Sequence, residues 1–260
     1  MNLSSIASVV SRLDYVETTG STNSDVAAAA SESAAEWPDL SVLCASSQTA
    51  GRGRSGRQWT SKANASLAAS ILVRPAGVPL THFGWLPILA GLAMSQTVAE
   101  FLPHQDVSLK WPNDVLVNDK KVSGVLSELL PSSDAVVIGA GLNLSQEQDE
   151  LPIEAATSLM LEGVTVSFEQ ALESYLKNFV ALYKPFVANL GDADASGLRQ
   201  QTTAMCGTIG RRVRALMPGD QVVEGNAIDL DASGRILIAV DGQDQFYAVA
   251  AGDIVHLRHN

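Results

Sequence analysis

Hydrophobic residues recur every three to four positions in several segments of the chain, the spacing that places them on one face of an α-helix. This spacing predicts a short helix over Ile6 to Leu13, a longer one over Trp85 to Leu102 and a third over Phe168 to Leu190. An alanine-rich helix is expected after the triplet Ser21-Thr22-Asn23, whose residue types commonly cap a helix N-terminus. Local sequence favours capping for these side chains, and a helix N-terminus can also present N–H groups to a polar ligand.

Short apolar runs separated by turn residues predict strands elsewhere. One run covers Leu40 to Ala45, and three more between Val107 and Leu144 predict an antiparallel meander within a mixed sheet. Beyond residue 204, short strand-like runs alternate with turn signals in the manner of a small β-barrel. The polar segment Gly191 to Gly197 marks the boundary, so we expect domains at residues 1–200 and 204–260. The predicted fold class is α+β, with a mixed, largely antiparallel sheet covered by helices.

Composition narrows the classes of protein that this chain can be. Its 260 residues carry a net charge of -11, which argues against a broad nucleic-acid surface. The two cysteines are far apart and match no metal-binding spacing, which favours a reduced intracellular setting. No signal peptide is visible, and the most apolar run is too short to span a bilayer. We therefore expect a soluble, cytoplasmic protein with no membrane partner.

Positive charge is concentrated in one segment, Gln48 to Trp59. Three of the 17 basic residues, Arg52, Arg54 and Arg57, fall there within six positions and alternate with glycines. Glycine lets a backbone approach a ligand closely, and arginine suits phosphate and carboxylate oxygens. An exposed loop without a ligand would also explain the arginines alone. In an acidic chain, however, the cluster favours a small anion, and Trp59 offers a face on which a purine could stack.

Two familiar phosphate-binding motifs fit this loop incompletely. Gly51, Gly53 and Gly56 have the spacing of a dinucleotide-binding turn, but no helix start follows and no acidic residue lies about 20 positions on. In the P-loop pattern, Arg57 and Gln58 occupy the places of the required lysine and hydroxyl residue. The sequence therefore favours neither motif.

Taken together, these segments resemble biotin protein ligase, the enzyme family that attaches biotin to carrier domains. The resemblance covers roughly residues 14 to 160 in the family's order, and the C-terminal β-domain resembles that family's SH3-like barrel. It implies a class II synthetase-like catalytic domain before the barrel. The matching blocks are Gly20-Ser21-Thr22-Asn23, the Gln48 to Trp59 loop, Lys110-Trp111-Pro112-Asn113-Asp114, Lys121-Val122-Ser123-Gly124 and Gly139-Ala140-Gly141-Leu142-Asn143.

The implied reaction is consistent with this inventory of residues. Joining a carboxylic acid to a lysine amine in water requires activation of the acid, and ATP achieves this by forming an acyl-adenylate with release of pyrophosphate. Two anions must be brought together, so cations and Mg²⁺ are expected to dominate catalysis. The sequence contains no nucleophile elbow and no Cys–His arrangement that would indicate a covalent enzyme intermediate.

The resemblance also implies residue roles. The implied biotin-binding residues are Ser21, Thr22, Asn23, Gln48, Gly51, Arg52, Gly53, Arg54, Lys121 and Gly124. The implied ATP-binding residues are Arg52, Arg54, Arg57, Trp59, Lys110, Asn113, Lys121 and Asn143. The implied catalytic residues are Lys121, Arg54 and Asp114, with Lys121 as the main cation. Mg²⁺ is expected to enter with the ATP phosphates, without an assigned set of protein ligands. Judged without the resemblance, Lys121 reads as a solvated turn lysine.

The expected partner is the biotin carboxyl carrier domain of a biotin-dependent carboxylase, approached by a monomer or weak homodimer. Family members that also repress transcription carry a helix-turn-helix domain, and the 20 residues before Ser21 are too few for one. We therefore expect no DNA binding. Two alternatives remain open at this point: a related acyltransferase for lipoate or octanoate, and a nucleotide-binding module without catalysis.

Overall fold

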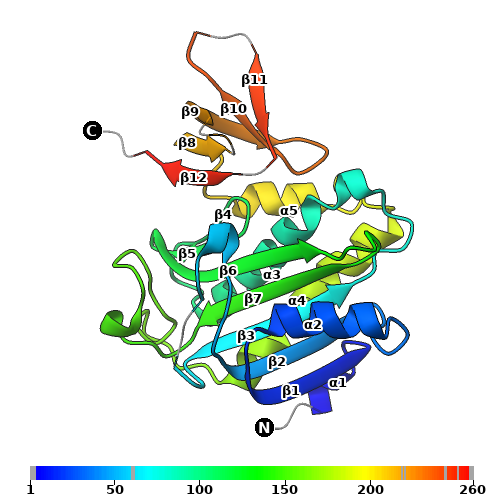
Figure 1. Ribbon diagram of the computed structural model, residues 1–260. Coiled ribbons are helices and arrows are strands. Elements are labelled where there is room, and N and C mark those ends of the chain that lie inside the picture. Colours follow the sequence, from blue (N-terminus) through cyan, green and yellow to red (C-terminus); the bar gives the residue numbers. More distant parts are fainter. Residues whose placement is uncertain are drawn as a thin grey trace.

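A seven-stranded mixed sheet forms the centre of the larger part of the molecule (Figure 1). The computed structural model describes residues 4–59, 62–217, 219, 221–242, 245–250 and 252–257. The strand order is β1-β2-β3-β7-β6-β5-β4; β1 and β2 are parallel, and the other ladders described are antiparallel. This arrangement confirms the predicted mixed, largely antiparallel sheet. The strands are β1 (Arg12–Thr19), β2 (Ser41–Gln48), β3 (Ser66–Val73), β4 (Val107–Lys110), β5 (Asp114–Val117), β6 (Lys120–Leu129) and β7 (Val136–Asn143).

Two long helices cover one face of this sheet, as the helical spacing predicted. Helix α3 (Trp85–Phe101) is buried along most of its length, and α4 (Phe168–Ala188) packs beside it. Helix α4 begins with a capping box in which Ser167 and Gln170 satisfy each other's backbone N–H groups. Helix α2 (Thr22–Glu32) lies on the opposite face, where Val26 packs against Val137 of β7. The rest of that opposite face is left for the cavity described below.

The predicted helix over Ile6 to Leu13 is wrong in its second half. Helix α1 covers only Ser4–Ala7, and β1 begins at Arg12, where Leu13 pairs with Val42 of β2. Leu13 and Tyr15 both pack against the core. Their two-residue alternation is the strand pattern, and sheet pairing prevails over the overlapping helical spacing.

The C-terminal part is a five-stranded antiparallel sheet in the order β11-β10-β9-β8-β12. Its strands are β8 (Arg212–Met217), β9 (Gln221–Leu230), β10 (Ile236–Ala239), β11 (Phe246–Val249) and β12 (Asp253–His256). Helix α5 (Leu198–Met205) precedes it and packs on α3, so the predicted boundary at residues 200–204 falls within a helix. Three short 3₁₀ turns complete the elements within the described residues: η1 (Arg54–Gly56), η2 (Leu80–His82) and η3 (Gln148–Glu150).

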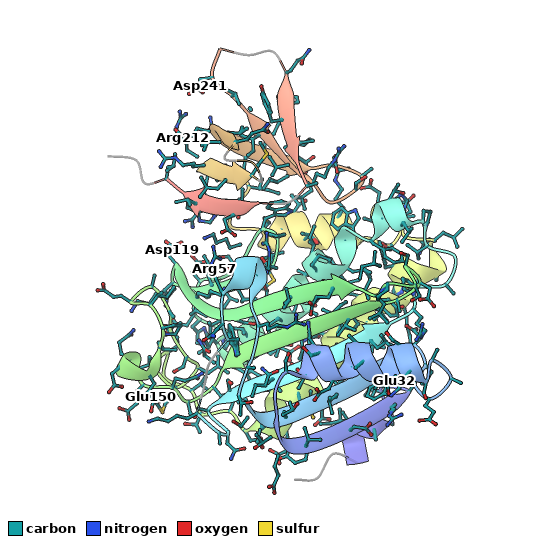
Figure 2. The ribbon with its side chains drawn as sticks, viewed as in Figure 1. Glu32, Arg57, Asp119, Glu150, Arg212 and Asp241 are labelled. Carbon is teal, nitrogen blue, oxygen red and sulfur yellow. The ribbon has the colours of Figure 1, made fainter. Side chains whose placement is uncertain are left out.

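Two buried tryptophans fasten the C-terminal sheet to the larger one. The indole N–H of Trp85 donates to the carbonyl of Ala232 at 2.9 Å, and that of Trp111 donates to Gly234 at 3.0 Å. Both acceptors lie in the turn between β9 and β10. Figure 2 shows Arg57 and Asp119 at the junction of the two sheets. The C-terminal sheet is thereby held over one end of the open face.

No helix among the described residues is both long enough and apolar enough to cross a membrane.

Candidate active site

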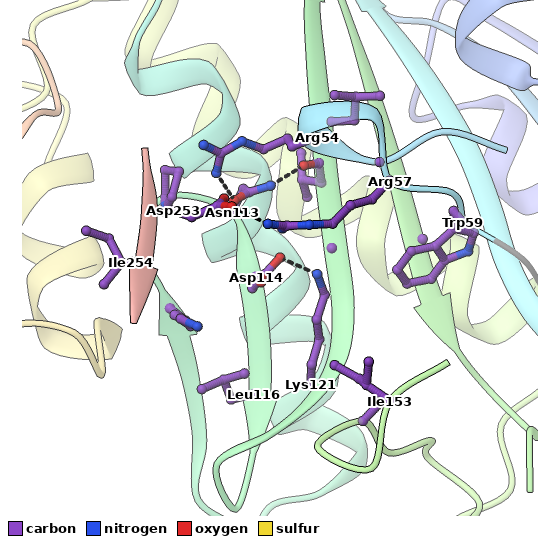
Figure 3. A pocket seen from close by; sticks show the side chains of 18 of the residues that line it. Arg54, Arg57, Trp59, Asn113, Asp114, Leu116, Lys121, Ile153, Asp253 and Ile254 are labelled. Carbon is purple, nitrogen blue, oxygen red and sulfur yellow. Dashed lines mark hydrogen bonds and ion pairs between the residues drawn. The ribbon is translucent and has the colours of Figure 1, made fainter. Parts of the chain in front are cut away.

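A cavity of about 1120 Å³ opens on the sheet face not covered by α3 and α4, beside the C-terminal sheet. All the site residues predicted from the sequence line it except Gly51. Figure 3 shows six of them: Arg54, Arg57, Trp59, Asn113, Asp114 and Lys121. A Cβ at Gly51 would overlap the carbonyl oxygen of Trp59 and lie 3.0 Å from Gln48 Nε2. Gly51 therefore permits close packing at the base of the arginine loop rather than lining the cavity.

One end of the cavity is polar and rigid. Ser21 occupies the N-cap position of α2, yet its side chain makes no capping hydrogen bond, so the predicted capping role is wrong for it. Instead, Gln48 of β2 accepts through Oε1 from the Thr22 backbone N–H at 2.8 Å and from the Thr22 hydroxyl at 3.1 Å. Ser21, Thr22 and Asn23 are all buried. This end can recognise a small polar group.

Ser70 of β3 supports this polar end and was not identified from the sequence. Its fully buried hydroxyl lies 2.7 Å from Thr22 Oγ1 and 2.6 Å from Asn23 Oδ1. Gly139 of β7 faces the Asn23 side chain, and a Cβ at Gly139 would lie 2.9 Å from Asn23 Cγ. The first turn of α2 therefore rests directly on the sheet.

The arginine loop is a small hairpin, with an Arg52–Gln58 bridge and the 3₁₀ turn η1 at its tip. Its three arginines extend to different elements. Arg52 pairs with Glu128 of β6 at 2.7 Å, and Arg57 pairs with Asp253 of β12. Arg54 donates to Asn113 Oδ1 and to the carbonyl of Gly252, both at 2.8 Å. The loop is thus held from both sheets.

Lys121 lies in the middle of the cavity and forms an ion pair with Asp114 at 2.6 Å (Figure 3). A Cβ at Gly124 would lie 3.1 Å from Lys121 Nζ, so the glycine leaves room for this side chain. Lys110 lines the same region, and its burial lowers its pKa below the ordinary value. Lys121 lies on strand β6, and its side chain is 30% exposed and paired with Asp114, so the interpretation of it as a solvated turn lysine is wrong.

Trp59 and Asn143 occupy the other end. The Trp59 indole lies against Gly141, where a Cβ would come within 2.5 Å of Cζ2, and its buried Nε1 has no hydrogen-bond partner among the residues that the structure describes. Asn143 donates to the carbonyl of Thr157 at 2.9 Å and accepts from Gln146 at 3.0 Å, which ties down the segment after β7. Pro152 and Ile153 of that segment line the cavity.

The C-terminal sheet contributes Asp253 and His256, and the residue before its first strand is Arg211; no sequence motif indicated these three residues. Burial, together with Lys110 and Arg211, lowers the pKa of His256 to about 4, so its ring is neutral at pH 7. The cations Arg54, Arg57, Lys110, Lys121 and Arg211 all line one cavity of an acidic protein. Three of these cations are paired with Asp114, Asp253 and Asp119 of the same cavity. Seven Arg and Lys residues still outnumber three Asp residues in the lining, and this excess of positive charge favours a polyanion.

No group of three or more His, Cys, Asp and Glu side chains able to hold a metal ion occurs among the residues described.

The fold and this cavity together define a ligase of the biotin and lipoate type. Residues 15–143 match the biotin/lipoate A/B protein ligase family, and residues 208–257 match the biotin protein ligase C-terminal domain. The chain is 40% identical to the biotin–[acetyl-CoA-carboxylase] ligase of Mycobacterium tuberculosis, over 95% of this chain and 90% of that protein. It belongs to the biotin protein ligase family.

Two further comparisons agree. The biotin protein ligase of Aquifex aeolicus, solved in complex with biotin and ATP, superposes with a TM-score of 0.75 at 28% identity, over 95% of this chain and 99% of that one. The bifunctional ligase/repressor BirA of Bacillus subtilis is 31% identical over 77% of this chain, but that match spans 62% of the longer relative.

Proposed function

We propose that this chain activates biotin with ATP and then transfers it to a lysine of a biotin carboxyl carrier domain. A biotin carboxylate oxygen attacks the α-phosphorus of ATP, the bond to the β-phosphate breaks, and pyrophosphate leaves. The lysine amine then attacks the acyl carbon of biotinyl-AMP and loses a proton, and AMP leaves. The observation that carries the proposal is one cavity that joins a polar end at the start of α2 to a cluster of cations around Lys121.

The polar end suits the ureido group of biotin, which offers N–H donors and a carbonyl acceptor. Ser21, Thr22, Asn23 and Gln48 form this end, and the loop segment 52–54 would enclose the valeryl chain of biotin. The Ser21 hydroxyl is free of a capping bond and can turn toward a ligand. A buried polar site built this way rejects analogues that leave its groups unpaired.

Lys121 stands where the two reacting anions meet, and its ammonium group would contact the biotin carboxylate and the α-phosphate. Asp114 holds that ammonium group in place before the substrates arrive. Arg54 and Arg57 would neutralise phosphate charge as it shifts toward the leaving pyrophosphate, supported by Lys110 and Asn113. Trp59 and Asn143 would position the adenosine, with the indole supplying a stacking face.

Mg²⁺ would bind chiefly through the phosphate oxygens of ATP, as it does at sites with few protein ligands. The Asp114 carboxylate pairs with Lys121 through one oxygen, whereas the Asn113 amide oxygen already accepts from Arg54, so Asp114 is the protein ligand that fits the ion. When bound, the ion supplies charge neutralisation on the triphosphate.

The carrier domain is the expected protein partner, and the segment at 204–260 is the expected second domain. The chain is expected to act as a monomer or weak homodimer. It is also expected not to bind DNA, and its net charge of -11 supports this expectation. Two cysteines that form no disulfide favour the cytoplasm as the place of reaction.

The proposal is tested by incubating the chain with biotin, Mg²⁺–ATP and a purified carrier domain, and weighing the carrier by mass spectrometry. We expect one biotinyl addition that requires ATP and is absent from a carrier whose target lysine is replaced by arginine. Lipoate in place of biotin distinguishes the related acyltransferase. ATP binding without any modified carrier or adenylate would refute the proposal in favour of a binding module.

A further inference from the structure

Glu128, near the end of β6, joins two parts of the site that are far apart in the sequence. Its Oε2 accepts from Asn23 Nδ2 at 2.8 Å and from the Arg52 guanidinium at 2.7 Å. Asn23 belongs to the first turn of α2, and Arg52 to the arginine loop. One carboxylate therefore connects the polar end of the cavity to the loop that closes over it.

The hydrogen bonds of Asn23 leave its amide little freedom to bind a substrate. Its Nδ2 donates to Glu128 and also to the carbonyl of Leu126 at 3.2 Å, which uses both amide protons. Its Oδ1 lies 2.6 Å from the Ser70 hydroxyl, and the side chain is almost fully buried. Asn23 is thus placed to hold the first turn of α2 against the sheet.

The Arg52 side chain is similarly occupied. Its guanidinium is paired with Glu128 of β6, whereas Arg57 is paired with Asp253 and Arg54 donates to Asn113, in the part of the cavity lined by Lys110 and Lys121. Its partner Glu128 also accepts from Asn23, so the Arg52 guanidinium is bound at the polar end of the cavity. At the same time, Arg52 lies opposite Gln58 in the hairpin, between the bonds from the Gly53 N–H to the Arg57 carbonyl at 2.7 Å and from the Trp59 N–H to the Gly51 carbonyl at 2.9 Å. The side chain therefore fixes the path of the backbone.

We propose that Glu128 is a positioning residue for biotin, which fixes Asn23 and the Arg52 backbone on either side of the head-group end. Arg52 then serves biotin through its main chain, and phosphate binding falls to Arg54, Arg57, Lys110 and Lys121. This differs from the expectation that Arg52 contacts the phosphate. The inference rests on the proposed biotin-adenylation reaction.

The test uses biotin-dependent exchange of labelled pyrophosphate into ATP, with biotin and ATP varied separately. Glu128→Gln keeps the shape of the side chain but removes its charge and turns one oxygen into a donor, which faces two other donors. We expect the KM for biotin to rise about 10-fold, the factor that one charge-assisted hydrogen bond is worth. The KM for ATP and the kcat at saturating biotin should stay within about 2-fold of wild type, because the phosphate cations are untouched.

Arg52→Ala should raise the biotin KM in the same way, and the double variant should be no worse than the more affected single variant, because both changes break one linkage. Arg52→Lys should restore part of the loss. Glu173→Gln serves as the matched control, since Glu173 pairs with Lys177 on the exposed side of α4. Thermal unfolding of each variant checks that it is folded.

Two results would overturn the inference. One is an Arg52→Ala variant with a raised ATP KM or lowered kcat and an unchanged biotin KM, which would make Arg52 a phosphate ligand. The other is a Glu128→Gln variant indistinguishable from Glu173→Gln while wild type exchanges normally. Wild type that is folded but shows no biotin-dependent exchange would instead refute the proposed function itself.

Discussion

A methyl group added at Gly141 should impair ATP use and spare biotin binding. The Cβ of an alanine there would lie within 2.5 Å of Trp59 Cζ2 and 2.8 Å of Nε1, whereas unbonded carbon atoms prefer about 3.5–4.0 Å. Strand β7 cannot yield, because Gly141 is paired with Ala68 of β3 on one side and Gly124 of β6 on the other. The indole must therefore move by about 1 Å.

A displacement of about 1 Å in a positioning group can cost about 100-fold in rate, so kcat/KM for ATP should fall by about that factor in Gly141→Ala. Gly139→Ala should show the reverse pattern. Its Cβ would lie 2.9 Å from Asn23 Cγ, at the polar end of the cavity, so biotin affinity should suffer first. The two substitutions lie two residues apart on one strand, yet Gly141→Ala should impair the use of ATP and Gly139→Ala the binding of biotin.

The assay combines pyrophosphate exchange, which gives kcat/KM for ATP, with calorimetric titration of biotin in the absence of ATP. Gly20→Ala is the control, because nothing lies within 4 Å of a Cβ built there. The reasoning is refuted if Gly141→Ala stays within about 2-fold of Gly20→Ala in kcat/KM for ATP, well short of the loss expected from a misplaced group. It is also refuted if Gly141→Ala weakens biotin binding as much as Gly139→Ala does.

Three further predictions use different measurements. Trypsin should cut the free protein in the segment 52–57, and biotin with ATP should suppress that cleavage. The reason is that three like charges on a glycine-rich loop order best around an anion. Equal cleavage with and without ligands would contradict this prediction. Because the pKa of His256 falls from 6.5 to about 4 on folding, the unfolded chain binds more protons between these values, and stability should be lost as pH falls from 6.5 to 4. His256→Asn should flatten that part of the profile in urea unfolding at several pH values, and an unchanged slope would refute the assignment. Burial raises the pKa of the Cys44 thiol to about 12, so Cys44 should react with a thiol reagent only on unfolding. Comparing the thiol labelling of wild type and Cys44→Ala, folded and unfolded, measures the reaction at this residue.

Long amphipathic segments were predictable because one face of each is buried along its whole length. This holds for α4. Helix α3 is buried nearly all round and was predictable from its long apolar segment, and the meander from β4 to β7 was predictable from the turn residues between its short apolar runs. The error at the N-terminus arose where helical and strand spacings overlap at Leu13. The local hydrophobic pattern could not distinguish helix from strand at these residues, because the strand forms only by pairing with β2.

The cavity was predictable in part for a different reason. Its central residues lie in compact motifs, and the structure brings these motifs together at one cavity. Arg211, Asp253 and His256 could not be predicted, because they form no local motif with the other site residues. Arg57 and Asp253, for example, are separated by 196 positions in the chain. Glu128 and Ser70 were missed because each reads locally as an ordinary strand residue. Their importance comes from what α2 and the arginine loop place beside them.

The central claim is that Lys121 promotes adenylation of biotin, and pyrophosphate exchange tests it most directly. Exchange should appear only with biotin and should fall about 100-fold or more in Lys121→Ala, the usual cost of removing one preorganised group that stabilises charge. Lys120→Ala, at the exposed neighbouring position, should keep wild-type exchange. Absence of exchange in folded wild type, or equal activity in the two lysine variants, would contradict the account.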